Sequence, residues 1–527
     1  MIIKTVLIVF PPLVRRKDNF DIAYKYLDFE TYRLVTPIEP VTMATDLKRS
    51  GLEVSVFDLG TYYDDGNDAL SEKLNQFKPD AVVVANSVLT FGSTFDVDGE
   101  DIFRMARKLF PNCVTILTGT HATNYPGVVV QKKICDFSIK GEPELAVGQL
   151  IKAFNYTKEF SSIDGLSCLK DDSTVFTHSN STQLNLVDLP LPDYGLVQSD
   201  QQASYFKFLE YGKIRFPEKS HRYRDIQTSK GCILDCNFCS VKHLRGGQRY
   251  RRKSLDVILA EIKQALENGI QEIHFFDDLF IENEQQVFEF ANALVKENLK
   301  FPWFVGQGMP LWPLTFDGLT ALRETGMYRI ICPFESGSDR VLKKVIGKLA
   351  SVEHNSKVIE WSKKNDLEVI GLFVIGIPDE TRDDLIKTID FAENHSDIDY
   401  TVFSIATPLV GTRMTRKAVK QGIYQDKGLL KKVIKRTVAL YHTDQFSEVE
   451  LGLIRAFDWD RINFSTVERK KKYCQMVGIT IEQLELSRKT SQEKFYHHFP
   501  SYDGILSFKD LYALNKTSKN CASIISK

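Results

Sequence analysis

The sequence has few of the features of an exported or membrane protein. Of its 527 residues only nine are cysteines, an odd number, and three of them fall within eight positions. A disulfide framework does not have this spacing in a chain of this size. No run of about 18 apolar residues occurs, so we expect no membrane-spanning segment. The apolar start, residues 1–14, is interrupted by Lys4 and two prolines and precedes no small-residue cleavage site. It reads as a strand rather than a signal peptide, and the reducing cytoplasm is the expected compartment.

The chain also lacks net charge. It carries 68 Lys and Arg against 69 Asp and Glu, so no nucleic acid is implied as a partner. The balance is uneven, because residues 411–527 hold 22 basic and 12 acidic side chains. A solvated surface explains this basic tail, and so does contact with an anionic or lipid-like substrate, another protein or a membrane surface. No Gly-x-Ser-x-Gly elbow occurs, so nothing indicates a serine nucleophile.

Apolar runs alternate with helical patterns through residues 1–155. The runs that suit buried strands are residues 6–10, 54–59, 81–85, 114–118 and 136–139. This alternation predicts an α/β domain, a Rossmann-like parallel sheet with helices on both faces. Ligands of such sheets bind outside the carboxyl ends of the strands. The candidate binding residues at those ends are Pro12, Asn86, Ser87, Gly119, His121 and Glu142.

A second alternation follows. Residues 156–215 read as a linker with a small hairpin at residues 161–178. Six strand candidates then lie at residues 226–229, 272–276, 303–305, 329–334, 368–375 and 400–406. Six βα units predict a partial (β/α)6 barrel of the TIM type over residues 216–420. Residues 421–527 read as a helical, basic C-terminal region. Its amphipathic basic segment, residues 429–441, suits packing on the barrel and also leaves peripheral membrane contact open.

Three cysteines, Cys232, Cys236 and Cys239, follow the first barrel strand. Three thiolates at this spacing can converge on one metal centre. Structural zinc takes four protein ligands, whereas an iron–sulfur cluster held by three leaves one iron open. A zinc site completed by Cys332 or His243, or three unpaired buried cysteines, are the alternatives.

The triplet resembles the signature of the radical S-adenosylmethionine (SAM) family, as does Ser229-Lys-Gly231 before it. This resemblance implies a [4Fe–4S] cluster on the three cysteines, which binds SAM and reduces it to a 5′-deoxyadenosyl radical. It also implies that Phe238 lies against the adenine. Later motifs match in order and place further residues around SAM. They are Asp277 and Asp278 after the second strand, Glu335 and Ser336 after the fourth, Gly376 after the fifth and Pro408 after the sixth.

The first domain resembles the cobalamin-binding module that precedes one large radical SAM class. The matching phrases include Gly119-Thr-His121, Lys140-Gly-Glu142 and Leu189-Pro-Leu-Pro-Asp193. An Asp-x-His-x-x-Gly motif, which supplies an axial histidine in other cobalamin domains, is missing. The absence of this motif is consistent with methyl transfer from cobalt. It is equally consistent with a domain that no longer binds cobalamin. Taken alone, such a sheet can hold a nucleotide or nothing.

The combined resemblance implies a cobalamin-dependent radical SAM methyltransferase that acts on an unactivated carbon of a small-molecule or lipid-like substrate. A flavodoxin- or ferredoxin-type protein is the expected electron donor. Relatives that use both cofactors for ring formation, rearrangement or oxygen insertion give a second hypothesis. A cobalamin-binding sensor with a relic barrel is a third, and the intact cysteine triplet argues against it.

Overall fold

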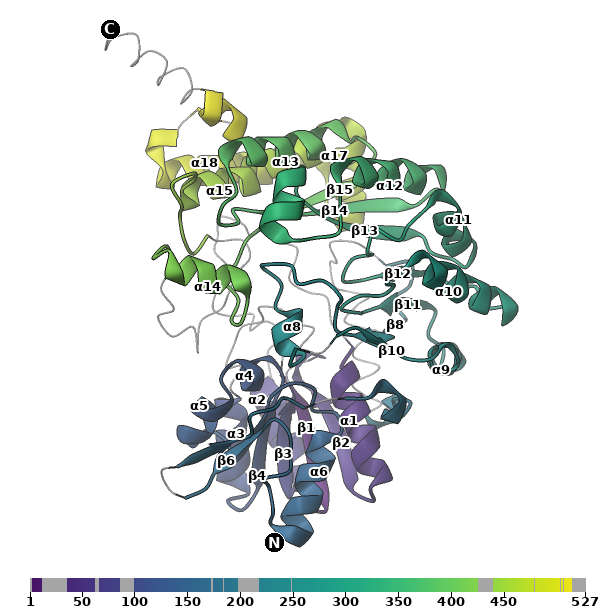
Figure 1. Cartoon of the computed structure of the whole chain (residues 1–527), viewed down its shortest axis with the longest axis vertical. Helices are drawn as coiled ribbons and strands as arrows, with labels where there is room; N and C mark the ends of the chain where they lie inside the picture. The colour runs from purple at the N-terminus through teal and green to yellow at the C-terminus, as the bar shows by residue number, and fades with distance from the viewer. Residues whose placement is uncertain are drawn as a thin grey trace.

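The computed structural model describes residues 2–11, 36–61, 66–85, 99–171, 174–182, 184–197, 218–247, 249–424, 439–477, 479–502, 504–505 and 507–513. Two α/β units and a helical C-terminal region make up the chain, and Figure 1 shows them stacked along its long axis. No helix among these residues is long and apolar enough to cross a membrane.

The N-terminal unit is a seven-stranded sheet in the order β2-β1-β3-β4-β5-β6-β7. Its parallel strands are β1 (Thr5–Phe10), β2 (Glu53–Asp58), β3 (Ala81–Ala85), β4 (Val114–Thr118) and β5 (Phe137–Ile139). These strands are nearly continuous apolar runs because helices cover both faces of the sheet. The covering helices include α1 (Ile38–Arg49), α2 (Gly66–Phe77), α3 (Glu100–Leu109), α5 (Pro126–Gln131) and α6 (Ala146–Lys152). The doubly wound sheet that the sequence predicts is therefore confirmed.

The hairpin expected within the linker forms as β6 (Leu166–Leu169) and β7 (Val175–Thr177). It pairs antiparallel with β5, so this part of the predicted linker extends the first sheet. Three short helical turns complete this part of the chain: η4 (Ala153–Thr157), η5 (Leu186–Asp188) and η6 (Tyr194–Leu196).

The second unit is a partial barrel of six parallel strands in two groups of three. One group is β8 (Tyr223–Ile226), β11 (Glu272–Phe275) and β12 (Trp303–Val305). The other is β13 (Arg329–Glu335), β14 (Glu368–Ile375) and β15 (Tyr400–Ile405), and a bridge between Trp303 and Met327 links the two groups. The outer helices are α9 (Leu255–Glu267), α10 (Glu284–Lys296), α11 (Phe316–Glu324), α12 (Val352–Lys364) and α13 (Arg382–Asn394). The helix after β15, α14 (Arg413–Lys420), lies apart from them (Figure 1).

Local signals explain where the barrel helices begin. Ser254 caps α9 by accepting a hydrogen bond from the Val257 amide, and Thr381 forms a capping box at α13. The first strand was predicted at residues 226–229, which is about three residues too late. The strand begins earlier, at residues that include Arg224 and Asp225, which the apolar pattern does not mark as a strand. Both charged side chains are buried because they contact partners distant in sequence. The Arg224 guanidinium lies 3.9 Å over the Tyr194 ring, and Asp225 accepts from the Thr36 amide.

The C-terminal region is helical, as predicted, and packs on the β15 side of the barrel. Its elements are α15 (Glu448–Leu453), η9 (Ile454–Asp458), α16 (Trp459–Asn463), α17 (Val467–Val477), α18 (Ile481–His498) and η10 (Pro500–Tyr502). The Asn463 amide group bonds both backbone groups of Thr401 at 2.8 and 3.0 Å, which joins this region to β15. Most of the expected amphipathic segment at residues 429–441, namely residues 429–438, lies outside the described residues.

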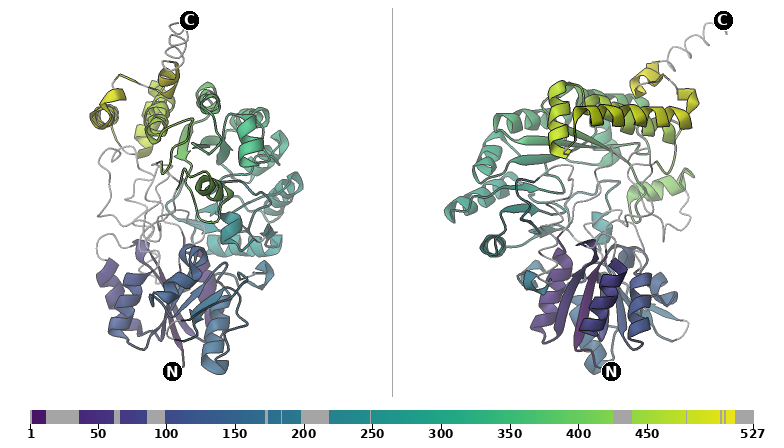
Figure 2. Two further views of the ribbon diagram at one scale, coloured as in Figure 1. Left: turned by 60° about the vertical axis from the view of Figure 1, so that its left-hand side comes forward. Right: turned by 180° about the vertical axis from the view of Figure 1, so that it is seen from behind.

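The carboxyl ends of the first sheet face the barrel. In Figures 1 and 2, β1 runs from the N-terminus toward the second unit, and the short helix α8 (Val241–Leu244) lies between the two. Three further short elements belong to this junction: α4 (Thr120–Asn124), β9 (Ser229–Lys230) and β10 (Arg251–Arg252), which pairs antiparallel with β9. A ligand on the first sheet would therefore face the second unit.

Candidate active site

The cysteine loop, residues 231–239, connects β9 to α8 at this junction. It begins at Gly231, whose positive φ of 79° suits glycine and whose amide donates to Asp278 at 2.8 Å. On its other side, the Asn237 amide donates to the Ile346 carbonyl at 2.9 Å, and the Met414 amide donates to the Asn237 carbonyl at 2.8 Å. Neighbouring elements therefore fix the loop backbone at both ends.

The three thiols lie on this one loop and are partly buried. Burial raises the pKa of Cys232, and it raises the pKa of Cys236 to about 12. It also raises the pKa of Cys239, with further increases from Cys236 and Cys232. Each would therefore be a neutral thiol unless a metal displaced its proton, as metal ligation does. Among the described residues, no group of three or more His, Cys, Asp or Glu side chains converges into ready metal-binding geometry, so the fit of this loop to a metal rests on its residue types. The donor set, three cysteines on one braced loop, fits an iron–sulfur cluster with one open iron.

The two aspartates after β11 brace this loop. Asp277 is buried and accepts hydrogen bonds from the Thr228 amide at 2.7 Å and the Ser229 amide at 2.6 Å. Burial raises the pKa of Asp277 and these hydrogen bonds lower it. Burial is the larger effect, so the pKa is about 6. Asp278 accepts a hydrogen bond from the Gly231 amide at 2.8 Å and another from Arg245 Nε at 2.7 Å. Both carboxylates hold the entrance of the cysteine loop, and their contact with SAM stays a prediction.

The other residues predicted around SAM lie at the same end of the barrel. Phe238 packs with Cys236 against an apolar cluster that includes Ile346, Ile377 and Met414. Pro408 is buried just after β15.

Glu335 has a positive φ of 64° and accepts from Lys348 at 2.8 Å, and the hydroxyls of Ser336 and Thr388 lie 2.9 Å apart. Gly376 has a φ of 79°, and a Cβ there would lie 2.5 Å from Leu451 Cδ1, so only glycine fits. These roles toward SAM stay predictions.

Glu380 closes the turn after β14 and is fully buried. Its Oε2 accepts from the amides of Gly376 at 2.7 Å and Ile377 at 3.1 Å, whereas Oε1 has no hydrogen-bond partner in the described part of the chain. Burial raises the pKa of Glu380 from 4.5 to about 8. The folded chain therefore retains a proton that the unfolded chain releases between these pH values, and its stability falls as the pH rises through this range.

We expect Glu380→Gln to remove this pH dependence, since glutamine keeps the acceptor oxygen and does not titrate. From about pH 5 to about pH 8, the thermal unfolding midpoint of the wild type should fall more steeply than that of the variant. At the upper end the variant should be at least as stable as the wild type. Parallel profiles of the two midpoints across this range would contradict the assignment.

The residues predicted to hold cobalamin lie at the carboxyl edge of the first sheet, or outside the described residues. Pro12, Asn86 and Ser87 belong to the latter group. Gly119 follows β4 with a φ of 91°, and His121 is buried in α4 with its ring 5.2 Å from that of Tyr125.

The sheet order reverses between β1 and β3, and ligands of doubly wound sheets bind at such a reversal, so this is the edge where a cofactor of the first sheet would lie. Glu142 makes a bidentate ion pair with Arg251 of the barrel unit, at 2.7 Å for both bonds. Contact of these residues with cobalamin stays a prediction.

A buried ionic network joins the two units, and sequence reasoning missed it. Arg245, the residue that follows α8, donates to Asp278 and, at 3.0 Å, to Glu39 of α1. Lys230 of β9 bonds Glu144 and lies 3.6 Å from Glu39. Every member is at most 4% exposed as a side chain. The network ties the cysteine loop to the first sheet, and its pairs span up to 206 residues of sequence, which leaves no local signal.

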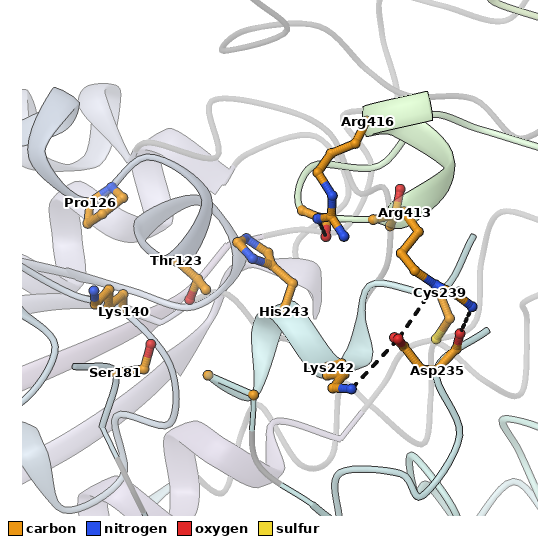
Figure 3. A pocket seen from close by; sticks show the side chains of 14 residues that line it. Thr123, Pro126, Lys140, Ser181, Asp235, Cys239, Lys242, His243, Arg413 and Arg416 are labelled. Carbon is orange, nitrogen blue, oxygen red and sulfur yellow. Dashed lines mark hydrogen bonds and ion pairs between the residues drawn. The ribbon is translucent and has the colours of Figure 1, made fainter. Parts of the chain in front are cut away.

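A cavity of about 490 Å³ opens beside the loop, between the two units. Figure 3 shows Lys140 on the side of the first sheet, Arg413 and Arg416 of α14 on the opposite side, and His243 between them. Cys239 forms part of the wall. Cations therefore surround a hollow that reaches a cysteine of the loop.

Comparisons with known proteins agree with this architecture. Residues 226–392 match the family model described as the radical SAM superfamily. An uncharacterised methyltransferase of Pyrococcus horikoshii is 28% identical over 67% of this chain and 72% of its own length. The cytidylyl-2-hydroxyethylphosphonate methyltransferase of Streptomyces wedmorensis is 24% identical over 83% and 89%.

Two solved structures share the fold. The cobalamin-dependent SAM radical enzyme OxsB with aqua-cobalamin bound superposes with a TM-score of 0.67, at 15% identity over 94% of this chain and 73% of that one. The radical SAM methyltransferase TsrM of Kitasatospora setae, with cobalamin and a [4Fe–4S] cluster, gives 0.62, at 16% identity over 81% and 80%. At these identities the likeness concerns the fold, and it covers both α/β units.

Proposed function

We propose that this chain, which belongs to the radical SAM superfamily, is a cobalamin-dependent methyltransferase that acts on an unactivated carbon. One observation carries the proposal. The three-cysteine loop after the first barrel strands lies opposite the carboxyl edge of a doubly wound sheet, and buried ion pairs hold the two together. Residues 1–155, 216–420 and 421–527 then act as cobalamin domain, radical SAM barrel and helical cover, with residues 156–215 as the connection.

Cys232, Cys236 and Cys239 are assigned as the residues that would hold a [4Fe–4S] cluster. When bound, such a cluster would supply the electron for reductive cleavage of SAM. Phe238 and the glycine turn at Gly376 are assigned to the adenine, and Glu335 and Ser336 to the ribose. Asp277, Asp278 and Pro408 complete the SAM pocket in this assignment.

The chain itself contributes position and exclusion of water. Asp278 and Arg245 fix the start of the cysteine loop relative to α1, so the distance between the two cofactor sites depends on these ion pairs. Buried apolar side chains around Phe238 keep water from the region where a radical forms. Precise placement of this kind is the main task of a protein whose cofactors carry the chemistry.

Gly119, His121 and Glu142 are assigned to the cobalamin side, together with Pro12, Asn86 and Ser87. Glu142 acts by orienting Arg251 of the barrel unit, with which it pairs. When bound, cobalamin supplies a methyl donor that reacts with a carbon radical. The substrate is then a small or lipid-like molecule held between the two units.

A flavodoxin- or ferredoxin-type protein is the proposed source of electrons. The reducing cytoplasm is the proposed compartment, since the eight described cysteines are all free thiols. Both choices follow from the cluster, which needs a low-potential reductant.

Product analysis with SAM that carries a deuterated methyl group tests the function. Loaded with iron and cobalamin and given reductant and a substrate, the enzyme should form S-adenosylhomocysteine and 5′-deoxyadenosine in equal amounts, with deuterium in the product. Cytidylyl-2-hydroxyethylphosphonate is a reasonable first substrate, as the substrate of a relative. If any accepted substrate gives 5′-deoxyadenosine without S-adenosylhomocysteine, the chain performs ring formation or rearrangement instead.

A further inference from the structure

The cavity beside the cysteine loop has a cationic lining. Its basic side chains are Lys140, Lys242, His243, Arg413 and Arg416, and its one carboxylate is Asp235. That carboxylate lies 3.7 Å from Lys242 and 3.5 Å from Arg413, the contacts drawn in Figure 3. Since one acid cannot offset four permanent cations, the cavity carries a positive potential. The lowered pKa of His243 agrees, because Arg416 and Lys140 add to the effect of burial there.

The cations are accessible. The side chains of Lys242 and Arg413 are 54% and 48% exposed, and Asp235 is 48% exposed. Arg416 is exposed as well. Further exposed lysines lie on the two elements that brace the loop, Lys343 and Lys344 on η7 (Val341–Ile346) and Lys417 and Lys420 on α14. Lys343 pairs with Asp339 and Lys417 with Asp379, so Lys344 and Lys420 extend the positive charge beyond the hollow.

The position of the cavity relative to the cysteines separates it from the SAM site. Cys239 lines it, together with Asp235 from the middle of the same loop and Lys242 of α8. None of the residues assigned to SAM lines this cavity. A molecule in it approaches the loop from the side that Cys239 lines, and an electron for a cluster held by this loop would enter through that cysteine.

We propose that this cationic hollow is the docking site of an acidic one-electron-transfer protein, which reduces the cluster through Cys239. The proposal rests on the proposed function. The donor loses one electron, the oxidised cluster gains it, and the electron then passes to SAM, whose C5′–S bond breaks into methionine and the 5′-deoxyadenosyl radical. No proton is exchanged with the donor. Opposite charge on the two surfaces accelerates encounter and fixes orientation.

The test compares Lys242→Gln/Arg416→Gln with the wild type, using a recombinant acidic flavodoxin as the probe. Arg413 is left unchanged because it also bonds the Asp235 and Ile346 carbonyls and so supports the loop. The matched control is Lys296→Gln/Lys489→Gln, two exposed lysines on α10 and α18. Binding of labelled flavodoxin is measured by fluorescence anisotropy at low and high salt. Formation of 5′-deoxyadenosine is measured with reduced flavodoxin and, separately, with dithionite.

We expect the Lys242/Arg416 variant to bind flavodoxin about tenfold more weakly at low salt, and the control to bind like the wild type. Flavodoxin-driven cleavage of SAM should fall by a similar factor while dithionite-driven cleavage is unchanged. Unaltered flavodoxin binding in the variant would overturn the proposal. An equal loss with both reductants would also overturn it and assign the cavity to a phosphate-bearing substrate or cofactor. Absence of cleavage with dithionite in the wild type would instead refute the proposed function, and the binding measurement would still decide the docking site.

Discussion

Replacing any one of Cys232, Cys236 and Cys239 with alanine is expected to abolish iron binding and reduce SAM cleavage to background. The reason is the ligand count. The three thiols lie on one loop and would be the protein ligands of a [4Fe–4S] cluster whose fourth position is kept for SAM. Loss of one thiol would leave only two protein ligands, which is too few to retain the cluster. Iron and acid-labile sulfide per chain, with 5′-deoxyadenosine as the activity readout, measure the effect. Cobalamin binding, which depends on the first sheet, should persist in all three variants.

Cys332→Ala is the matched control, because Cys332 is a buried thiol in β13. Its loss should leave iron content and SAM cleavage unchanged. A loss of metal in this variant would favour the alternative in which Cys332 completes a zinc site. SAM cleavage at the wild-type rate in a variant in which all three loop cysteines are replaced by alanine would refute the radical mechanism.

Arg245→Ala is expected to destabilise the chain strongly. Arg245 is 1% exposed and donates to Asp278 and Glu39, so its loss leaves two buried carboxylates without their main counter-charge. Breaking a buried pair in this way costs about 3–5 kcal/mol. The thermal unfolding midpoint should fall by roughly 10 °C. Differential scanning calorimetry of the metal-free protein isolates this effect from cluster loading.

Two variants show whether the effect comes from the buried charge. Arg245→Lys keeps the charge and loses the forked geometry, and it should recover part of the stability. Arg104→Ala removes an arginine that is 66% exposed and pairs with Glu100 and Asp101 on its own helix, so it should change stability by less than about 1 kcal/mol. Equal midpoints for Arg245→Ala and Arg104→Ala would show that the network does not hold the two units together.

Sequence reasoning found the elements whose signals are local. The strand at Glu368–Ile375 was predicted correctly, because an apolar run is readable within a few residues. It missed the start of β8, where buried charges with distant partners replace apolar residues. Burial of a charged residue depends on tertiary contacts that no short window contains.

The residues of the candidate site also fall into those with a local sequence signal and those without one. The cysteine spacing identified the loop, since cluster ligation needs those residue types close together in sequence. Arg245 and Lys230 gave no such signal, because their partners Glu39 and Glu144 lie in the other unit. The cationic cavity could not be predicted from the sequence either, since its arginines and lysines come from three separate stretches of the chain.

The cofactor content of one preparation tests the central claim, that a single chain holds a cluster and cobalamin facing each other. The protein is expressed with added iron and hydroxocobalamin and purified without oxygen, and iron, sulfide, zinc and cobalt are measured per chain. We predict about four irons, four sulfides and one cobalt. Zinc without iron would contradict the cluster, and iron without cobalt would contradict the role assigned to the first domain.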